Sequence, residues 1–193
     1  MFICVEGLDG SGKTTQAQIL TERLSKEYRA VYTAEPSRGR TGTFIRECCL
    51  YEKKRLPPHS EALLFAADRI EHIENEVKPA LAEGKVVVCD RYLYSSLAYQ
   101  GSAGLNLVWI KKINSYALKP DFAVFIDVPP ERVLERIKRK KSVMETLEIQ
   151  RKVREVYLRF VRQGELVLVD GNKTREQVAE DLLSKVQQFL RKR

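Results

Sequence analysis

The sequence predicts an α/β fold built around a mainly parallel β-sheet. Short apolar runs alternate along the chain with longer segments whose apolar residues recur about every 3.6 residues, the pattern of strands joined by helices. Each run is β-branched and nearly free of polar residues, as expected for strands buried on both faces. With 193 residues, the chain is long enough for one well-buried core but short for two full domains. We therefore expect a single three-layer domain over residues 1–193.

Five segments have the composition of buried strands. They cover residues 2–6, 30–33, 85–90, 121–128 and 165–170. Parallel strands cannot be joined by a tight turn, so each connection must cross over the sheet, and such crossovers are right-handed. We therefore expect helices on both faces of the sheet.

Four segments between or after these strands have helical character. Apolar residues share one face in residues 14–28 and in residues 60–83, and Pro79 is expected to kink or reset the second of these helices. Residues 130–163 are also expected to be helical and carry a strongly basic stretch, and residues 174–191 are expected to form a final amphipathic helix.

Composition and charge narrow the classes of function. Hydrophobic residues make up 44% of the chain and charged residues 31%, which places it among globular proteins and excludes the disordered class. Lysine and arginine outnumber aspartate and glutamate by 34 to 26, so the formal net charge is +8. This balance favours polyanionic partners such as nucleotides, nucleic acids or an anionic membrane surface, and charge alone does not choose among them.

No targeting segment or membrane span is expected. A span needs about 20 consecutive apolar residues, whereas the apolar stretch at the N-terminus ends before Glu6. Cys4, Cys48, Cys49 and Cys89 have neither Cys-x-x-Cys spacing nor a histidine cluster, so we interpret them as small core residues rather than zinc ligands. The expected location is a reducing cytoplasm.

Residues 7–14 (GLDGSGKT) match the G-x-x-x-x-G-K-[ST] phosphate loop in full, directly after a strand and before a helix. The glycines allow a tight turn in which successive backbone N–H groups converge on phosphate oxygens, and the helix adds the positive end of its dipole. Lys13 supplies a charge between the β- and γ-phosphates, and the Thr14 hydroxyl can ligate Mg²⁺. ATP and Mg²⁺ are therefore the ligands expected here.

Further charged residues are expected at the edge of the sheet where open α/β folds bind ligands. Asp90 ends the third strand and can hold Mg²⁺, and Arg91 can grip an anionic acceptor with its planar guanidinium. Asp127 ends the fourth strand in a similar way and competes for the metal, with Asp90 favoured. Within the phosphate loop, the Asp9 carboxylate would repel phosphates, so Asp9 either faces a second substrate or caps a local turn.

Phe65 and Arg69 lie four residues apart in the second expected helix and therefore share one face. A ring that stacks and a guanidinium that donates hydrogen bonds can address one nucleobase together. Taken singly, each residue is also consistent with an ordinary position, a phenylalanine in the core and an arginine on the surface.

These features occur together with other motifs in one order along nearly the whole chain. The motifs are Glu6-Gly7-x-Asp9-Gly10-x-Gly12-Lys13-Thr14-Thr15, Glu35-Pro36, Leu64-Phe65-x-x-x-Arg69, Asp90-Arg91-Tyr92, Ala98-Tyr99-Gln100-Gly101, Phe125-Ile126-Asp127-Val128-Pro129-Pro130-Glu131 and Val153-Arg154-x-x-Tyr157. The combination resembles the thymidylate kinase (dTMP kinase) family of phosphate-loop kinases. The resemblance implies a five-stranded sheet in the order 2-3-1-4-5, transfer of the γ-phosphoryl group of ATP to dTMP, a requirement for Mg²⁺, and a homodimer.

The resemblance also implies how the acceptor nucleotide is held. Phe65 would stack on thymine, Arg69 would bond its exocyclic oxygen, and Gln100 would lie near the base. Tyr99 would lie under the deoxyribose and help to exclude a 2′-hydroxyl, and Asp9 would accept the 3′-hydroxyl. A carboxylate in the phosphate loop is thereby explained.

By the same resemblance, Arg91 with Arg38 would hold the acceptor phosphate, and residues 136–145 would form a mobile basic lid. No arginine stands in the phosphate loop, so the lid is expected to supply the catalytic cation from Arg136 or Arg139. The implied site comprises Gly7, Leu8, Asp9, Gly10, Ser11, Gly12, Lys13, Thr14 and Thr15 for ATP; Asp9, Pro36, Arg38, Phe65, Arg69, Arg91, Tyr99 and Gln100 for dTMP; Thr14 and Asp90 for the metal; and Lys13, Arg91, Arg136 and Arg139 for catalysis.

Two other functions remain open. A deoxynucleoside kinase shares the phosphate loop but needs a base to deprotonate a hydroxyl, whereas Arg91 and Arg38 suit an acceptor that already carries phosphate. A nucleic-acid-dependent phosphate-loop ATPase or switch would use the net charge to bind a polynucleotide. Nucleic acid is not an expected partner, because much of the excess charge lies in the expected lid and at the C-terminal tail, and residues 172–175 (NKTR) lack the aspartate of a guanine-reading N-K-x-D motif.

Overall fold

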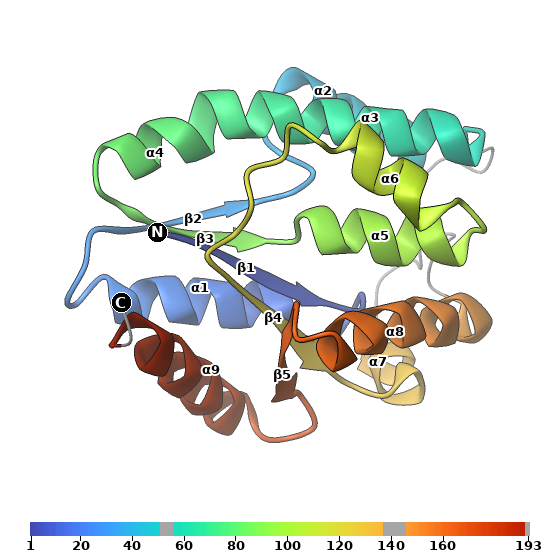
Figure 1. Cartoon of the computed structure of the whole chain (residues 1–193). Helices are drawn as coiled ribbons and strands as arrows, with labels where there is room; N and C mark the ends of the chain where they lie inside the picture. The colour runs from blue at the N-terminus through green and yellow to red at the C-terminus, as the bar shows by residue number, and fades with distance from the viewer. Residues whose placement is uncertain (51–55, 137–145, 192–193) are drawn as a thin grey trace.

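The computed structural model of the chain describes residues 1–50, 56–136 and 146–191. Within them, five parallel strands form one sheet in the order β2-β3-β1-β4-β5 (Figure 1). The strands are β1 (Phe2–Gly7), β2 (Ala30–Ala34), β3 (Val86–Asp90), β4 (Phe122–Asp127) and β5 (Val167–Asp170). The predicted strand order is confirmed, and the five predicted strands are all present.

The register of the central strand brings several strand ends to one edge of the sheet. β1 lies between β3 and β4, with Val5 paired with Asp90 and Gly7 paired with Ile126. The phosphate loop that follows β1 therefore lies beside the last residues of both neighbouring strands. In open α/β sheets this edge is where ligands bind.

Alternate strand residues face the two sides of the sheet and build two hydrophobic clusters. On one side, Ile3 and Val5 pack with α1 (Lys13–Leu24) and α9 (Arg175–Leu190). On the other side, Phe2 and Cys4 belong to a cluster completed by several helices. These are α3 (Pro58–His72), α4 (Lys78–Ala82), α5 (Leu93–Ser102), α6 (Leu107–Ile113), α7 (Pro130–Arg136) and α8 (Leu147–Arg162). The result is a three-layer arrangement, with α1 and α9 on one side of the sheet and α3 and α5 on the other (Figure 1).

The first helix is shorter than predicted. α1 ends at Leu24, whereas the helix was expected to reach Tyr28. Leu24 is the last buried apolar residue of this helix, and the chain then turns through bonds from the N–H groups of Lys26 and Glu27 to carbonyls three residues earlier. Without a further apolar position to bury, continuing the helix would gain little free energy.

The helix expected over residues 60–83 is built from three consecutive segments. α3 continues into one π-helical turn at Ile73–Val77, and α4 follows. Pro79 lies two residues after that turn and has no N–H to donate. Wider π turns interrupt the regular α-helical ladder, so the turn relieves the constraint that Pro79 imposes. The predicted reset of the helix is confirmed.

Three helical segments among the described residues were not predicted. They are α2 (Arg40–Ile45), which continues into a π-helical turn at Arg46–Leu50, and the helices α5 and α6. α5 has buried residues at six consecutive or near-consecutive positions, so it lacks a one-sided apolar period. α2 and α6 have only 6 and 7 residues, which is too short for a periodic signal.

The C-terminal part of the chain contains the last helices. The segment predicted as helical from 130 to 163 holds α7 and α8, and α8 begins at a new cap in which the Thr146 hydroxyl accepts the N–H of Ile149 at 3.3 Å. α9 begins at a capping box formed by Thr174 and Gln177. α8 and α9 bury their apolar faces in the two hydrophobic clusters on either side of the sheet.

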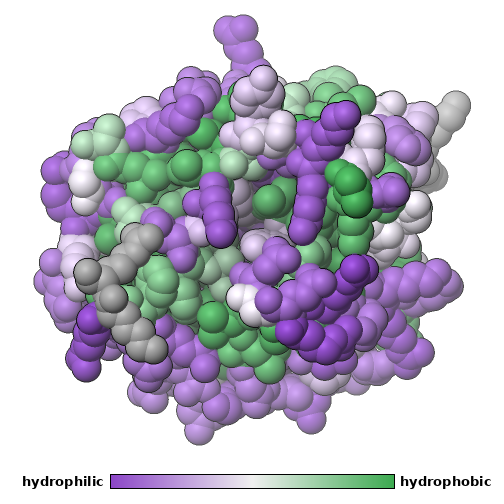
Figure 2. Space-filling view, in the orientation of Figure 1, coloured by the Kyte–Doolittle hydropathy of each residue, from purple (hydrophilic) through white to green (hydrophobic). Residues whose placement is uncertain are grey.

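Charged side chains cover much of the outside of the molecule. Figure 2 shows hydrophilic residues over most of one face, with apolar residues visible between them. Ion pairs such as Lys152 with Glu148 at 2.7 Å and Arg162 with Glu155 at 2.6 Å join exposed side chains, and each contributes at most about 1 kcal/mol. Stability therefore depends mainly on the two apolar clusters. In the part of the chain that the structure describes, no helix is both long and apolar enough to cross a membrane.

Candidate active site

The phosphate loop is shaped to present backbone N–H groups to an anion. Gly10 and Gly12 adopt positive φ angles of 86° and 87°, which other residues rarely adopt. The loop leads into α1, whose first turn has neither an acidic side chain nor a side-chain cap. The N-terminal N–H groups and the positive end of the helix dipole are therefore left for a ligand. Leu8 is fully buried, so it can contribute to such a site only through its backbone.

Lys13 lies under the loop rather than in solvent. The residue is 6% exposed, and its ammonium donates to the carbonyl of Leu8 at 3.3 Å and lies 3.8 Å from the Asp9 carboxylate. Burial, and then the charge of Arg91, lower the pKa of Lys13 from its ordinary value. A bound phosphate would act in the opposite direction and favour the charged ammonium.

Thr14 and Asp90 form a pair of oxygen ligands at the edge of the sheet. The Thr14 hydroxyl donates to Asp90 Oδ2 at 2.5 Å, while Asp90 Oδ1 is buried and has no partner among the described residues. By contrast, both oxygens of Asp127 accept bonds from Arg154, at 2.7 and 2.8 Å. A hydroxyl and a carboxylate with a free oxygen are the hard ligands that Mg²⁺ prefers. The residues present at Thr14 and Asp90 therefore fit a magnesium ion.

Asp9 joins Arg91 and Tyr99 and also lies near Lys13 of the phosphate loop. Arg91 Nη2 forms an ion pair with Asp9, and the Tyr99 hydroxyl donates to the other carboxylate oxygen at 3.0 Å. Burial alone would raise the pKa of Asp9, but Arg91 and Lys13 outweigh it and hold that pKa at about 2. Asp9 is therefore an anion at neutral pH, placed where it accepts hydrogen bonds.

Arg91 owes its position to a buried carboxylate that the sequence did not single out as functional. Arg91 has a φ of 69°, a left-handed conformation that is strained for an arginine. The Glu6 carboxylate accepts the N–H of Tyr92 at 2.9 Å and the hydroxyls of Ser95 and Tyr157 at 2.6 and 2.9 Å. These bonds fix the residues that follow Arg91 at the start of α5. Ser95 in turn accepts a bond from Arg91 Nη1 at 3.1 Å.

A second group of predicted residues lies between α3 and α5. Arg69 is 2% exposed, and its Nη2 donates to Glu35 at 2.7 Å and to Ser96 at 3.1 Å, while its Nη1 donates to Asn114. Arg69 Nε and Gln100 Oε1 are buried and have no partner among the described residues. Arg69 is therefore buried, and the alternative interpretation of it as an ordinary surface arginine is wrong.

The unpaired donor and acceptor lie in the same part of the site. Gln100 follows Ser96 by one helical turn on α5, so both face the same side of that helix, and Ser96 contacts Arg69. Phe65 precedes Arg69 by one turn on α3 and is half-buried. The structure thus brings an aromatic ring, a free donor and a free acceptor onto two neighbouring helices.

The loop after β2 adds Pro36 and Arg38. The carbonyl of Pro36 accepts a bond from Arg46 at 2.8 Å, and Ser37 is anchored to Asp68 by bonds of 2.9 and 2.6 Å. Arg38 is exposed and stands four residues after the last residue of β2, Ala34. Because Ala34 pairs with Asp90 where β2 and β3 end, the loop that carries Arg38 starts from the same edge of the sheet.

The remaining predicted residues are Ser11, Thr15, Arg136 and Arg139. Thr15 is exposed in the first turn of α1, and Ser11 has a buried hydroxyl. Arg136 is exposed at the end of α7, and Arg139 and the rest of the expected lid lie outside the described residues.

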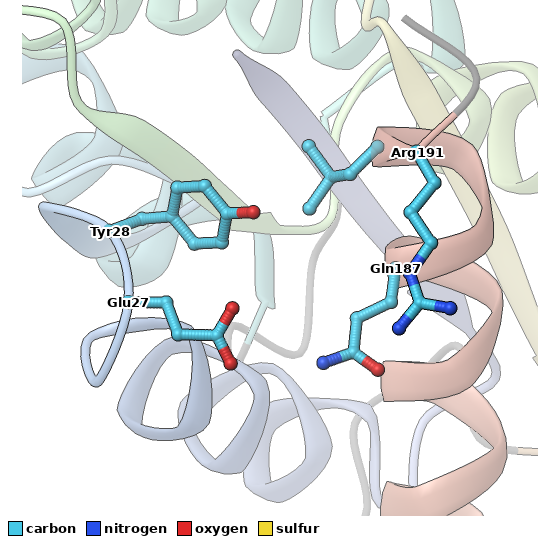
Figure 3. Close-up of a pocket in the computed structure, with 5 residues that line it drawn as sticks. Glu27, Tyr28, Gln187 and Arg191 are labelled. Carbon is cyan, nitrogen blue, oxygen red and sulfur yellow. The ribbon is translucent and has the colours of Figure 1, made fainter.

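A surface pocket elsewhere does not coincide with this site. It is lined by Glu27, Tyr28, Gln187, Leu190 and Arg191 (Figure 3). Glu27 and Tyr28 follow the C-terminal end of α1, and the other three residues lie at or just after the C-terminal end of α9, whereas the phosphate loop precedes the N-terminal end of α1. The pocket therefore lies at the opposite end of that helix from the phosphate loop.

Comparison with known proteins agrees with this arrangement. The family model for thymidylate kinase matches residues 5–182. A probable thymidylate kinase of Pyrococcus horikoshii is 43% identical, over 98% of this chain and 97% of that protein. The corresponding proteins of Pyrobaculum aerophilum and Methanocaldococcus jannaschii are 40% and 44% identical, over 98% and 90% of this chain and 98% and 88% of their own lengths. The chain therefore belongs to the thymidylate kinase family.

Proposed function

We propose that this protein transfers the γ-phosphoryl group of ATP to dTMP, giving dTDP and ADP. The observation that carries the choice of acceptor is the unpaired donor at Arg69 Nε together with the unpaired acceptor at Gln100 Oε1. Thymine offers the complementary groups, an acceptor at O4 and a donor at N3, whereas cytosine offers a donor at N4 and an acceptor at N3. With Arg69 facing position 4 of the base and Gln100 facing position 3, thymine pairs with both groups, whereas cytosine would set donor against donor and acceptor against acceptor and leave both buried groups unpaired.

ATP is proposed to bind at residues 7–15, with its phosphates at the N-terminus of α1 and Lys13 between the β- and γ-phosphates. Thr14 and Asp90 would hold Mg²⁺. When bound, the ion neutralises charge on the β- and γ-phosphate oxygens. The support for this placement is the free Asp90 Oδ1 beside the Thr14 hydroxyl.

dTMP is proposed to lie between the phosphate loop and helices α3 and α5. Phe65 would stack on the base, Tyr99 would lie under the deoxyribose, and Asp9 would accept the 3′-hydroxyl. Arg91 and Arg38 would hold the acceptor phosphate in line with ATP. Catalysis then consists of alignment and of neutralising charge on the transferred group. The remaining cation would come from Arg136 or Arg139 of the lid.

A deoxynucleoside kinase is the weaker alternative. Its acceptor hydroxyl must lose a proton, but Asp9, the carboxylate of the acceptor site, is held as an anion of pKa about 2 by Arg91 and Lys13, and so weak a base accepts a proton poorly. Polynucleotide-dependent ATP hydrolysis has no supporting feature in the described residues beyond net charge.

The test is ADP formation with ATP, Mg²⁺ and each of dTMP, dUMP, dCMP, dGMP, AMP and thymidine. We expect dTMP to be used far better than dCMP, the purine nucleotides or thymidine. Comparable or faster use of thymidine would replace the proposal by a deoxynucleoside kinase. Preference for dCMP over dTMP would overturn the interpretation of Arg69 and Gln100 while leaving the phosphate-transfer chemistry.

A homodimer in the cytoplasm is part of the same proposal. Leu63 and Ile70 lie seven residues apart on α3, on one face of that helix, and are 51% and 41% exposed. Phe44 of the adjacent α2 is 46% exposed. Apolar side chains gathered on one helical face support burial against a second copy. No disulfide joins cysteines in the described part of the chain, which supports a reducing compartment.

A further inference from the structure

Arg69 is held by a buried chain of hydrogen bonds that leads away from the acceptor site. The Glu35 carboxylate joins two residues of α3: one oxygen accepts Arg69 Nη2 at 2.7 Å, and the other lies 3.1 Å from Nδ1 of His72. Arg69, Glu35 and His72 are 2%, 5% and 1% exposed. Charged groups buried this deeply are destabilising unless each is paired. The three side chains therefore behave as one unit.

The imidazole of His72 is fixed on both sides. Its Nε2 lies 2.7 Å from the Thr33 hydroxyl, which also lies 2.8 Å from the Glu76 carboxylate. A carboxylate oxygen only accepts hydrogen bonds, so His72 Nδ1 must carry the proton and donate to Glu35. Rotation of the ring would break the bonds at both nitrogens. His72 thus restrains one oxygen of Glu35 and leaves the other for Arg69.

The guanidinium has three further contacts, with Asn114, Ser96 and the ring of Tyr92, whose centroid lies 5.1 Å from Arg69 Cζ. Asn114 accepts from Nη1 and Ser96 accepts from Nη2, and each offers a single oxygen on a rotatable side chain. The Tyr92 ring restrains the plane of the guanidinium but not its rotation within that plane. The ion pair with Glu35 restrains this rotation and so sets the direction in which Nε–H points. A guanidinium free to turn would no longer present Nε–H in one direction.

We infer that His72 is a positioning residue for base recognition, acting through Glu35 on Arg69. The inference rests on the proposed function, in which Arg69 Nε bonds the acceptor's base. The Glu35 N–H donates to the backbone carbonyl of Asp90 at 3.0 Å, but the bonds that link the side chains of Arg69, Glu35 and His72 do not include the side chains of Thr14 or Asp90. A change at His72 leaves that backbone bond in place, so losing the His72 contact is expected to affect acceptor recognition and to spare the transfer step. No atom of His72 itself needs to reach the nucleotide.

The test uses two variants that differ in which nitrogen they replace. Asparagine places its amide nitrogen near the position of histidine Nδ1, and glutamine places it near Nε2. His72→Asn therefore keeps a donor for Glu35, whereas His72→Gln keeps only the contact with Thr33. We expect His72→Gln to raise the KM for dTMP about tenfold with kcat unchanged and to reduce the preference for dTMP over dCMP. For His72→Asn, we expect both the KM and this preference to stay within about twofold of the wild-type values.

Other outcomes have distinct meanings. If the two variants change the KM for dTMP equally, or lower thermal stability and kcat without moving KM or base preference, His72 has only a structural role and the inference is wrong. A wild-type enzyme that does not prefer dTMP to dCMP would overturn the proposed function itself, and the inference with it. The wild type therefore tests the function, and the variant pair tests the role of His72.

A double-mutant cycle of His72→Gln with Glu35→Gln tests whether His72 acts on Arg69 through Glu35. Since His72 is inferred to act through Glu35, His72→Gln should raise the KM for dTMP in the parent and add little in the Glu35→Gln background. Equal effects in both backgrounds would contradict the route. Should Glu35→Gln prove unstable, the comparison of asparagine with glutamine at position 72 still decides the inference.

Discussion

Asp90 differs from the other acidic residue at the sheet edge because one of its oxygens lacks a partner. Thr14 occupies Oδ2, and Oδ1 is buried and unpaired among the described residues, whereas Arg154 occupies both oxygens of Asp127. An unpaired buried carboxylate oxygen is costly, and a cation relieves that cost. Asp90, whose buried and unpaired oxygen costs free energy, is thus also the expected metal ligand.

Asp90→Asn is expected to lower activity by about 10- to 100-fold and to raise the Mg²⁺ concentration needed for half-maximal activity. The amide oxygen can still accept from Thr14, so the fold should be retained. Activity titrated with Mg²⁺, together with a thermal melt, checks this. Tyr32→Phe is the matched control, since it removes a long 3.4 Å contact to Asp90 but leaves the carboxylate. A similar loss in both variants would argue against metal binding by Asp90.

Asp9 should make stability depend on pH in acid. Its pKa is about 2 in the folded chain, where Arg91 and Lys13 outweigh the effect of burial, and about 3.9 in an unfolded chain. The folded state therefore binds fewer protons between these values. The contribution of Asp9 to stability is complete above about pH 4 and is lost as the pH falls through about 2.

For Asp9→Asn, we expect the wild type to be more stable by about 1–2 kcal/mol at pH 6, with the difference shrinking below pH 4. The asparagine side chain would still accept hydrogen bonds through its amide oxygen, so the comparison isolates mainly the charge. Urea unfolding of both proteins at several pH values measures it. A difference that does not change with pH would show that the ion pair with Arg91 contributes nothing.

At the scale of the element, Glu6 connects β1 to the start of α5. Its carboxylate receives the N–H of Tyr92 and the hydroxyls of Ser95 and Tyr157, so a residue of the sheet caps a helix that has no cap of its own. Burial raises the pKa of Glu6 despite these bonds and Arg91. The strained backbone of Arg91 is held between these two elements.

Glu6→Ala is expected to cost about 1–2 kcal/mol, the usual effect of losing a helix cap, and to lower activity by releasing Arg91. Glu6→Gln should retain most of both, because its carbonyl oxygen can accept from Tyr92 while its amide donates to the hydroxyl oxygens. Thermal unfolding and the KM for dTMP of the two variants measure this. Equal losses in both would mean that the negative charge, and not the cap, is what matters.

Much of the fold was predictable at this scale because each strand is a short apolar run buried on both faces. The strand order came from the resemblance rather than from the composition of the strands. α5 was missed because residues such as Tyr94, Ser96 and Tyr99 bury it on several sides, which removes the one-sided period. Motif spacing identified Arg69 and Arg91, since each stands in a recognisable local pattern.

The residues that hold these arginines were not predictable as functional from spacing. Glu6 lies 89 positions from Ser95 and 151 from Tyr157, and Glu35 lies 34 from Arg69 and 37 from His72. Their meaning depends on which elements become neighbours in the fold. The motifs contain Glu6 and Glu35 but do not show what these residues contact, because a periodic or motif-based signal lies within one element, and partners this far apart emerge only from the structure.

For the whole molecule, the exposed apolar residues of α3 predict the state of association. Replacing both Leu63 and Ile70 by lysine is expected to convert the dimer to a monomer, because each lysine would bury an unpaired charge in the interface. Light scattering across a concentration series measures this. Val108→Lys, at a residue of α6 that is 76% exposed, is a control for added charge. A wild-type protein that is monomeric throughout would exclude the proposed dimer.

The place of β1 in the sheet determines when the chain can begin to assemble during synthesis. Both of its partners come later in sequence: β3 ends at Asp90 and β4 ends at Asp127, about 120 residues after β1. At the usual rate of about 5–20 residues per second, the ribosome completes β4 roughly 6–24 s after β1. During that interval the apolar strand β1 is not yet paired on both sides. A nascent chain of this protein should therefore depend on chaperones more than a protein whose strands pair with their neighbours in sequence.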